Sequence, residues 1–390
     1  MTETSALFGP TYGFGAYIHW PYCARICPYC DFNVYAAKER NTDPLVEAII
    51  QDLKTQARAL PDHPKLDTVF LGGGTPSLMT ATQIERLLSA CDSAFGLASD
   101  CEITLEANPN NVSEASARDW RQAGINRLSI GLQSLDEQAL RFLGRDHTGK
   151  EARTAAAIAH AVFPTFSLDM IYARPGQSLA AWEQELSAAL FLEAPHLSLY
   201  ELTIAPGTAF HKSAERGTLS ALDDALQADM YELTDEMTGR AGVSAYEISN
   251  HAATASDQSR HNMIYWRSGD WLGLGPGAHG RLSVNGTRLA TENMAKPDAY
   301  IKAVTETGSG FLERTALTRD ETGQELITMG LRPMVGLERQ RFEGLRSAPI
   351  PDATLLHLRS GGWLTHTPGT LALTQSGRLL ADRIALELTG

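Results

Sequence analysis

Three cysteines near the start of the chain are the residues whose type and spacing point most directly to chemistry. Cys23, Cys27 and Cys30 lie in the stretch YCARICPYCD with the spacing C-x3-C-x2-C, and no fourth cysteine stands nearby. Thiolates bind zinc and iron–sulfur clusters, and sites of both kinds usually have four protein ligands. Three thiolates therefore leave one position open, which the amine and carboxylate of a small molecule could fill.

Two kinds of metal site agree with this spacing. A zinc site would add His19 as the fourth ligand, although such sites usually combine two ligand pairs that are well separated in sequence, and no second pair is present. A [4Fe–4S] cluster would use the three cysteines and leave one iron open. The remaining cysteines, Cys91 in a helical pattern and Cys101 before a predicted strand, are placed for structural roles.

The composition of the chain narrows the class of protein. Its 390 residues carry a formal net charge of −13, with 43% hydrophobic and 20% charged residues. Such an acidic chain is poorly suited to nucleic acid, and we predict no nucleic-acid partner. The N-terminus lacks the basic and apolar regions of a secretory signal, and the longest weakly polar run is too short to span a bilayer. The sequence therefore predicts a cytoplasmic protein that is not integral to a membrane.

Alternating strand and helix patterns must position the cysteines. Apolar, β-branched segments are mostly followed by segments with the three-to-four spacing of a helix that buries one face. This alternation predicts an α/β fold with a parallel sheet, and six units predict a partial (β/α)6 barrel. The predicted strands are 16–19, 67–72, 102–107, 127–133, 166–172 and 196–202, and the predicted helices are 44–60, 81–95, 113–124, 151–163, 179–191 and 221–242.

Polar residues stand at or near the C-terminal ends of these strands. They are the GGGT stretch at 72–75, Glu106, Gln133, Asp169 and Glu201. In β/α barrels the C-terminal ends of the strands carry the chemistry, because their loops converge on one mouth. The three cysteines follow the first strand, so we expect them at the same mouth.

The alternation of strand and helix patterns changes at two points further along the chain. We divide the chain into a barrel (1–240), an extension and connecting segment with an HNxxYW motif (241–308), and a C-terminal domain (309–390). Residues 355–388 read as helix, strand, turn, strand and helix, the order of a winged-helix-like α+β unit. Because the chain is acidic, we do not expect this unit to bind DNA.

The cysteine spacing, together with GGGTPS, resembles the radical S-adenosylmethionine (SAM) superfamily, in which SAM occupies the open iron of a [4Fe–4S] cluster. From about residue 12 to the C-terminus the chain resembles its coproporphyrinogen oxidase-like branch, through YIHWPYCARICPYCDF, GGGTPS, LEANP, SIGLQS, LGRDH, LDMIYARPGQ and RHNMIYW in this order. The resemblance implies that the three cysteines hold the cluster. It implies that SAM is surrounded by Tyr17, Tyr29, Gly73, Gly74, Thr75, Glu106, Gln133, Arg145 and Asp169.

Three features separate the types of protein within this branch. The oxidases extend the motif to C-x3-C-x2-C-x-C, whereas Phe32 stands at the position of the extra cysteine here, and the oxidases have a longer segment before the cluster. The RHNMIYW stretch resembles a motif linked to haem, with His261 as the candidate axial ligand and Tyr265 and Trp266 as flat apolar surface. Alternatively, His261 is a hydrogen-bonded core histidine and the aromatic residues only pack the barrel against the C-terminal unit.

The resemblance therefore implies a haem chaperone, which binds haem and transfers it to an acceptor protein such as a haem enzyme of a respiratory chain. The alternative is an oxygen-independent coproporphyrinogen III oxidase, which oxidatively decarboxylates two propionates. A third interpretation is an iron–sulfur electron carrier that does not use SAM. Gln133, Arg145 and Asp169 argue against it, since a simple carrier has no need of such a polar rim.

Overall fold

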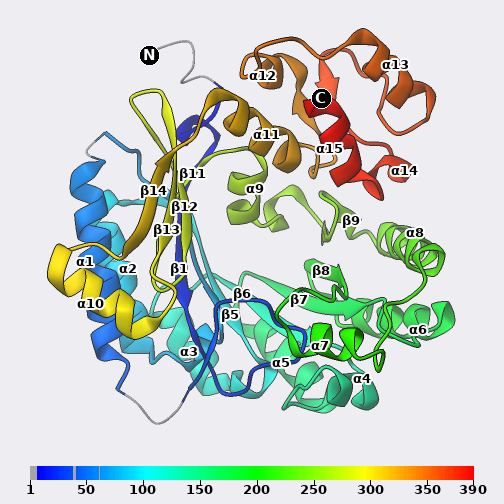
Figure 1. Cartoon of the computed structure of the whole chain (residues 1–390). Helices are drawn as coiled ribbons and strands as arrows, with labels where there is room; N and C mark the ends of the chain where they lie inside the picture. The colour runs from blue at the N-terminus through cyan, green and yellow to red at the C-terminus, as the bar shows by residue number, and fades with distance from the viewer. Residues whose placement is uncertain (1–6, 38–40, 61) are drawn as a thin grey trace.

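One curved sheet organises the part of the chain that the computed structural model describes, which is residues 7–37, 41–60 and 62–390. Figure 1 shows the sheet bending so that α1, α2 and α10 lie outside it, while the C-terminal unit, in orange and red, lies on its concave side. Across the sheet the strands are β14 (Phe311–Ala316), β13 (Thr287–Asn293), β12 (His279–Val284), β11 (Asp270–Leu274), β1 (Phe14–Trp20), β4 (Leu66–Gly73), β5 (Leu97–Ala107), β6 (Arg127–Gln133), β7 (Thr165–Tyr172), β8 (His196–Glu201), β10 (Asn250–Ala252) and β9 (Ser244–Ala245).

The strands from β11 to β8 run parallel, which confirms the predicted α/β partial barrel. Six of them are the predicted strands. The seventh, β11, comes from late in the chain and pairs with β1 from Phe14↔Asp270 to Ile18↔Leu274. It was not predicted, because it is followed by the β12–β13 hairpin and not by an amphipathic helix. Strand β5 begins at Leu97, so Cys101 lies inside this strand and not before it.

Helices that follow the parallel strands cover the convex face of the sheet. Their apolar faces pack on one core with the outward side chains of the strands. Helix α2 begins with a capping box in which Thr80 and Gln83 exchange hydrogen bonds. The helices up to residue 307 are α1 (Asp43–Ala59), α2 (Ala81–Phe95), α3 (Glu114–Gln122), α4 (Glu137–Phe142), α5 (Gly149–Val162), α6 (Leu179–Leu190), α7 (Ala209–Glu215), α8 (Asp224–Arg240), α9 (Arg260–Trp266) and α10 (Pro297–Thr307). Among the described residues, no helix combines the length and apolar character needed to cross a bilayer.

The concave face of the sheet is polar, and this is what leaves room for a site. Side chains alternate between the two faces of a strand. In β6, Leu128, Ile130 and Leu132 belong to the apolar core, whereas Arg127 and Ser129 line a cavity on the other face. Closed β/α barrels fill their interior with branched apolar side chains. Here small and polar side chains take those positions, so the interior stays open.

A second apolar core forms the C-terminal unit, around buried residues such as Leu326 and Phe342. The predicted order of helix, strand, turn, strand and helix is present in a shortened form. Leu364 and Leu373 form an isolated antiparallel bridge, the backbone N–H of Thr365 donates to the carbonyl of Ala372 (2.9 Å), and β16 pairs with the earlier β15. Because β14 completes the main sheet, we propose that the unit begins after residue 316 and not at residue 309. Its elements are α11 (Arg319–Gly330), β15 (Leu337–Glu338), α12 (Arg339–Glu343), α13 (Asp352–Ser360), β16 (Thr370–Leu371), α14 (Gln375–Arg378) and α15 (Ala381–Thr389).

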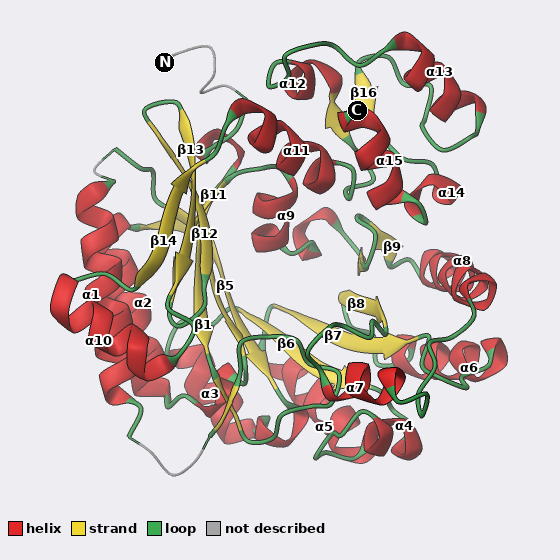
Figure 2. Cartoon of the chain, in the orientation of Figure 1, coloured by secondary structure: helices red, strands yellow, loops and turns green. Residues whose placement is uncertain are grey.

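Arginine side chains attach the C-terminal unit to the barrel. Arg332 pairs with the buried Glu247 at 3.3 Å, and its guanidinium lies 4.5 Å from the ring centre of Trp266. Arg378 pairs with Asp235 of α8 at 3.0 Å. Figure 2 shows this mostly helical unit above α9 and the open side of the sheet.

Candidate cluster and cofactor site

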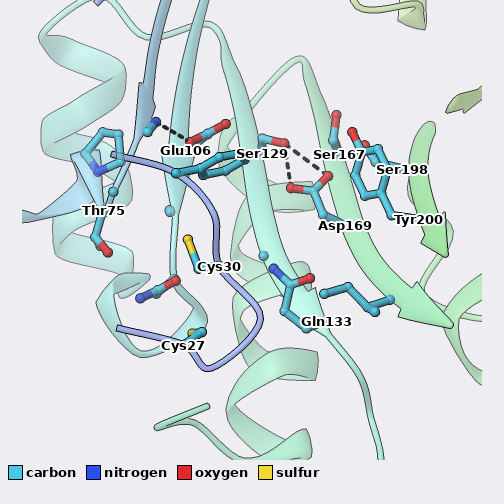
Figure 3. A pocket seen from close by; sticks show the side chains of 18 of the residues that line it. Cys27, Cys30, Thr75, Glu106, Ser129, Gln133, Ser167, Asp169, Ser198 and Tyr200 are labelled. Atoms are coloured by element: carbon cyan, nitrogen blue, oxygen red, sulfur yellow. Dashed lines mark hydrogen bonds between the residues drawn. The ribbon is translucent and has the colours of Figure 1, made fainter. Parts of the chain in front are cut away.

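A cavity of about 490 Å³ lies against the concave face of the sheet. The three cysteines and all nine residues predicted to surround SAM line it. They come from β1, from the segment 22–36 (the cysteine loop), and from the C-terminal halves or following loops of β4 to β7. Arg145 comes from the connection between α4 and α5. Figure 3 shows how Glu106, Gln133 and Asp169 extend from neighbouring strands toward the space beside Cys27 and Cys30. The fold thus brings together residues that are up to 152 positions apart, from Tyr17 to Asp169.

The glycine-rich turn after β4 holds the base of the cysteine loop. The backbone N–H of Gly74 donates to the carbonyl of Trp20 (2.7 Å), and that of Thr75 donates to the carbonyl of Tyr22 (2.8 Å). A Cβ atom at position 74 would lie 2.8–2.9 Å from those same two carbonyl oxygens, and 3.0 Å from the sulfur of Cys23. The close approach of the two backbones therefore requires glycine at this position. Short strands β2 (Tyr22–Cys23) and β3 (Tyr35–Ala36) pair with each other and close the loop.

The three thiols fit a [4Fe–4S] cluster with one open iron. Cys23, Cys27 and Cys30 are free and face one cavity. Among the described residues, no three His, Cys, Asp or Glu side chains are arranged so that they could hold one metal ion. A four-iron cluster binds each thiolate to a different iron, so its ligands do not converge on one point. Burial raises the pKa of Cys30 to about 11, so iron must displace a proton from this thiol.

His19, the fourth ligand of the zinc interpretation, is held by two other groups. Its Nε2–H donates to the carbonyl oxygen of Asn33 (2.8 Å), so its Nδ1 accepts a hydrogen bond from the hydroxyl of Tyr17 (2.9 Å). Both ring nitrogens are therefore used within the protein. His19 acts here as a link between β1 and the cysteine loop.

Two buried carboxyl groups share the centre of the cavity. Burial raises the pKa of Glu106 to about 8, against the opposing effect of a hydrogen bond from the Gly73 N–H (2.9 Å), and the charge of Asp169 raises it further. Burial also raises the pKa of Asp169 to about 6, while hydrogen bonds from Ser198 and Ser129 lower it. Near neutral pH Glu106 is mostly protonated, so it can donate as well as accept a hydrogen bond.

We expect Glu106→Gln to flatten the pH dependence of stability in the cluster-free protein. Between pH about 6 and about 8 the folded chain keeps a proton on Glu106 that the unfolded chain, with its ordinary pKa of 4.5, has released. The free energy of unfolding of the parent protein therefore falls as the pH rises through this window, by at most a few kcal/mol. Urea unfolding at pH 6 and at pH 8 measures this fall in the free energy of unfolding for both proteins. If the free energy of unfolding depended on pH equally in Glu106→Gln and the parent, Glu106 would be ionised in the folded protein.

Arg145 and Gln133 have the geometry of ligand-binding residues. Arg145 donates to the sulfur of Cys27 (3.4 Å), the side chain of Asn108 (2.7 Å) and the carbonyl of Gly131 (3.0 Å). Its buried Nε has no hydrogen-bond partner among the described residues, which leaves a donor for a carboxylate. Gln133 has a φ of +61°, where the pairing of β6 with β7 becomes irregular. Such strain is typical of functional sites.

The predicted haem-contact residues separate in the structure. His261 and Tyr265 line the cavity, but Trp266 does not, and it packs under Arg332. His261 is buried, and its ring nitrogens are hydrogen-bonded to the hydroxyls of Thr68 and Tyr265, each at 2.6 Å. Burial lowers the pKa of His261 to about 3, so the ring is neutral. Ligation of haem iron by His261 stays a prediction, and it requires release of one of these two bonds.

Several cavity residues were not predicted from the sequence. Ser129, Ser167, Ser198 and Tyr200 lie around Asp169, as Figure 3 shows. The signal for them is the alternation in RLSIGLQ, FSLDMIY and HLSLYEL, where, except at Glu201, every second residue is apolar and those between are mostly small or polar. This pattern indicates strands with one core face and one solvated face.

Comparisons with known proteins agree with this geometry. Residues 17–189 match the family model of the radical SAM superfamily. The chain is 33% identical to the heme chaperone HemW of Bacillus subtilis, over 95% of this chain and 97% of that protein. It is 40% identical to the heme chaperone HemW of Escherichia coli, over 73% and 75% of the two chains. The solved structure of the coproporphyrinogen III oxidase HemN from Escherichia coli superimposes with a TM-score of 0.82 at 21% identity, over 99% of this chain and 92% of that one, and shows the same fold.

The chain therefore belongs to the radical SAM superfamily and, within it, to the family of HemW-type haem chaperones. Membership of the superfamily implies a [4Fe–4S] cluster and SAM. A third relative, the mitochondrial radical S-adenosyl methionine domain-containing protein 1 of Danio rerio, is 36% identical over 94% of this chain and 85% of that protein.

Proposed function

We propose that this protein binds haem and transfers it to an acceptor protein, with a [4Fe–4S] cluster on Cys23, Cys27 and Cys30 and with SAM beside the cluster. The observation that carries the proposal is the similarity over nearly the whole chain to relatives named heme chaperones. Phe32, at the position of the additional cysteine of the oxidases, supports it. The likeness to HemN supports only the shared fold.

The cavity residues suit the recognition of SAM. When bound, the cluster supplies an electron that can cleave the sulfonium of SAM. The free Nε–H of Arg145 suits the carboxylate of SAM. Glu106 and Asp169 suit the ribose hydroxyls or the amino group, because both carry hydrogen-bonding oxygens at the centre of the cavity.

We also propose a cytoplasmic location and an acceptor among haem enzymes such as those of a respiratory chain. The clustered free cysteines support a reducing compartment. A transfer assay identifies the acceptor: haem-loaded protein is mixed with a candidate apo-enzyme, and the spectrum of the acceptor reports transfer.

The decisive experiment uses protein reconstituted in the absence of oxygen, with SAM and dithionite, and with or without coproporphyrinogen III. We expect saturable binding of one haem per chain and no decarboxylated product. Haem is titrated by absorbance, and product and 5′-deoxyadenosine are followed by chromatography. Decarboxylation that matches SAM cleavage would establish the oxidase, and absence of haem binding would overturn the proposal.

A further inference from the structure

Three large apolar side chains that are exposed to solvent line the cavity. Ile26 is 48% exposed, Phe32 61% and Tyr200 42%, and all three line the cavity. Ile26 and Phe32 flank Cys27 and Cys30 on the cysteine loop, and Tyr200 lies near the end of β8. Exposed apolar side chains that share one site indicate a ligand or partner surface, whereas isolated ones are common on any protein.

A cation without a partner stands beside these side chains. Arg25 is exposed and lines the same cavity, and within the described part of the chain it forms no ion pair or hydrogen bond. Arginine pairs well with carboxylates. An unpaired arginine next to two apolar side chains, in a chain with a net charge of −13, is a local exception to the acidic surface.

The cysteine loop and the segment that follows β8 form two sides of the cavity mouth, and they contact each other before any ligand binds. The backbone N–H of Phe210, at the start of α7, donates to the carbonyl of Pro28 in the cysteine loop (2.9 Å). The ring of Tyr29 lies 6.4 Å from that of Phe210, and both pack in one apolar cluster with Leu202. A surface built on segments that contact each other is preformed, as most small-molecule sites are.

We propose that Arg25, Ile26, Phe32 and Tyr200 form the surface on which the haem macrocycle lies, with Arg25 paired to a propionate. This inference rests on the proposed function, since it assumes that haem binds. Haem is a flat apolar ring with two carboxylates at one edge, and the mouth offers apolar side chains and one free guanidinium. The inner cavity is polar and suits SAM, whereas His261 lies buried with both ring nitrogens hydrogen-bonded.

Titration of haem into the cluster-loaded full chain tests the surface. We expect Phe32→Ala to weaken haem affinity about ten- to hundredfold, as expected for losing one large apolar contact. The matched control is Phe191→Ala, because Phe191 is 86% exposed and does not line the cavity. Iron content is measured in each variant, so that a damaged cysteine loop is recognised. Equal affinity of Phe32→Ala and the parent would overturn the inference.

The propionate contact is tested by changing both partners. The parent should bind haem about tenfold more tightly than haem dimethyl ester, in which the carboxylates are blocked, and Arg25→Gln should remove that difference. Arg118→Gln serves as the control, since Arg118 is 72% exposed and remote from the cavity. A preference for free haem that survives Arg25→Gln would assign the carboxylate to another residue and overturn this contact.

His261→Ala separates failure of this surface from failure of the proposed function. If His261→Ala loses haem affinity and Phe32→Ala keeps it, haem binds at the HNxxYW segment. That result would overturn the proposed surface but would agree with the chaperone function. Haem that binds the parent without saturation would refute both.

Discussion

Reconstitution of Cys27→Ala with iron and sulfide is expected to give a colourless protein with almost no bound iron. Two thiolates cannot replace the three that each hold a different iron, and no other cysteine lines the cavity in the described part of the chain. The same loss is expected for Cys23→Ala and Cys30→Ala. Iron and sulfide analysis with the visible spectrum measures it.

Cys91→Ala is the matched control for these variants. Cys91 is buried in α2, in the core of the convex side, and burial raises the pKa of its thiol to about 12. Its replacement removes one sulfur from the core and should leave the iron content unchanged. Full cluster content in any of the three cavity variants would show that the assignment of ligands is wrong.

Asp270→Ala is expected to destabilise the fold by about 3–5 kcal/mol, the cost of leaving a buried charge without its partner. Asp270 is fully buried at the start of β11 and pairs with the buried Arg288. Its carboxylate also accepts hydrogen bonds from the backbone N–H of Ser283 (2.7 Å) and from Nε2 of His63 (3.0 Å). Urea unfolding of the cluster-free protein measures the loss.

Glu114→Ala is the control for this second prediction. Glu114 pairs with Arg118 on α3, and both side chains are 72% exposed, so the pair contributes about 0.5 kcal/mol or less. Asp270→Asn keeps the shape of the side chain, so its loss of stability should lie between those of Glu114→Ala and Asp270→Ala. Stability of Asp270→Ala within 1 kcal/mol of the parent would mean that Arg288 reaches solvent or another acceptor.

Most of the site could be predicted from short segments of the sequence. The spacing of the cysteines, the glycines at 73 and 74, and the polar ends of the strands are each read from a few neighbouring residues. Parallel strands then bring these ends to one mouth without further information. Glu106, Gln133 and Asp169 could therefore be placed at one mouth from the sequence pattern, whereas Tyr17, Tyr29 and Arg145 followed only from the resemblance to the radical SAM superfamily.

Two parts of the structure depend on information that a short segment does not contain. The pairing of β11 with β1 joins residues about 256 positions apart, and nothing in DWLGL specifies that partner. The HNxxYW motif groups Tyr265 with Trp266, but consecutive helix residues point about 100° apart. Tyr265 shares a face with His261, four residues earlier, and so faces the cavity, while Trp266 turns toward the C-terminal unit.

The pairing of β1 between β4 and β11 sets an order on the assembly of the protein during synthesis. Strand β4 is available once residue 73 has emerged, but the other edge of β1 has no partner until residue 274 follows. Until then, the strand that leads into the cysteines has one open edge, and contacts of such long sequence separation form slowly. The strand that leads into the cysteine loop is thus paired on both edges only when most of the chain has been made.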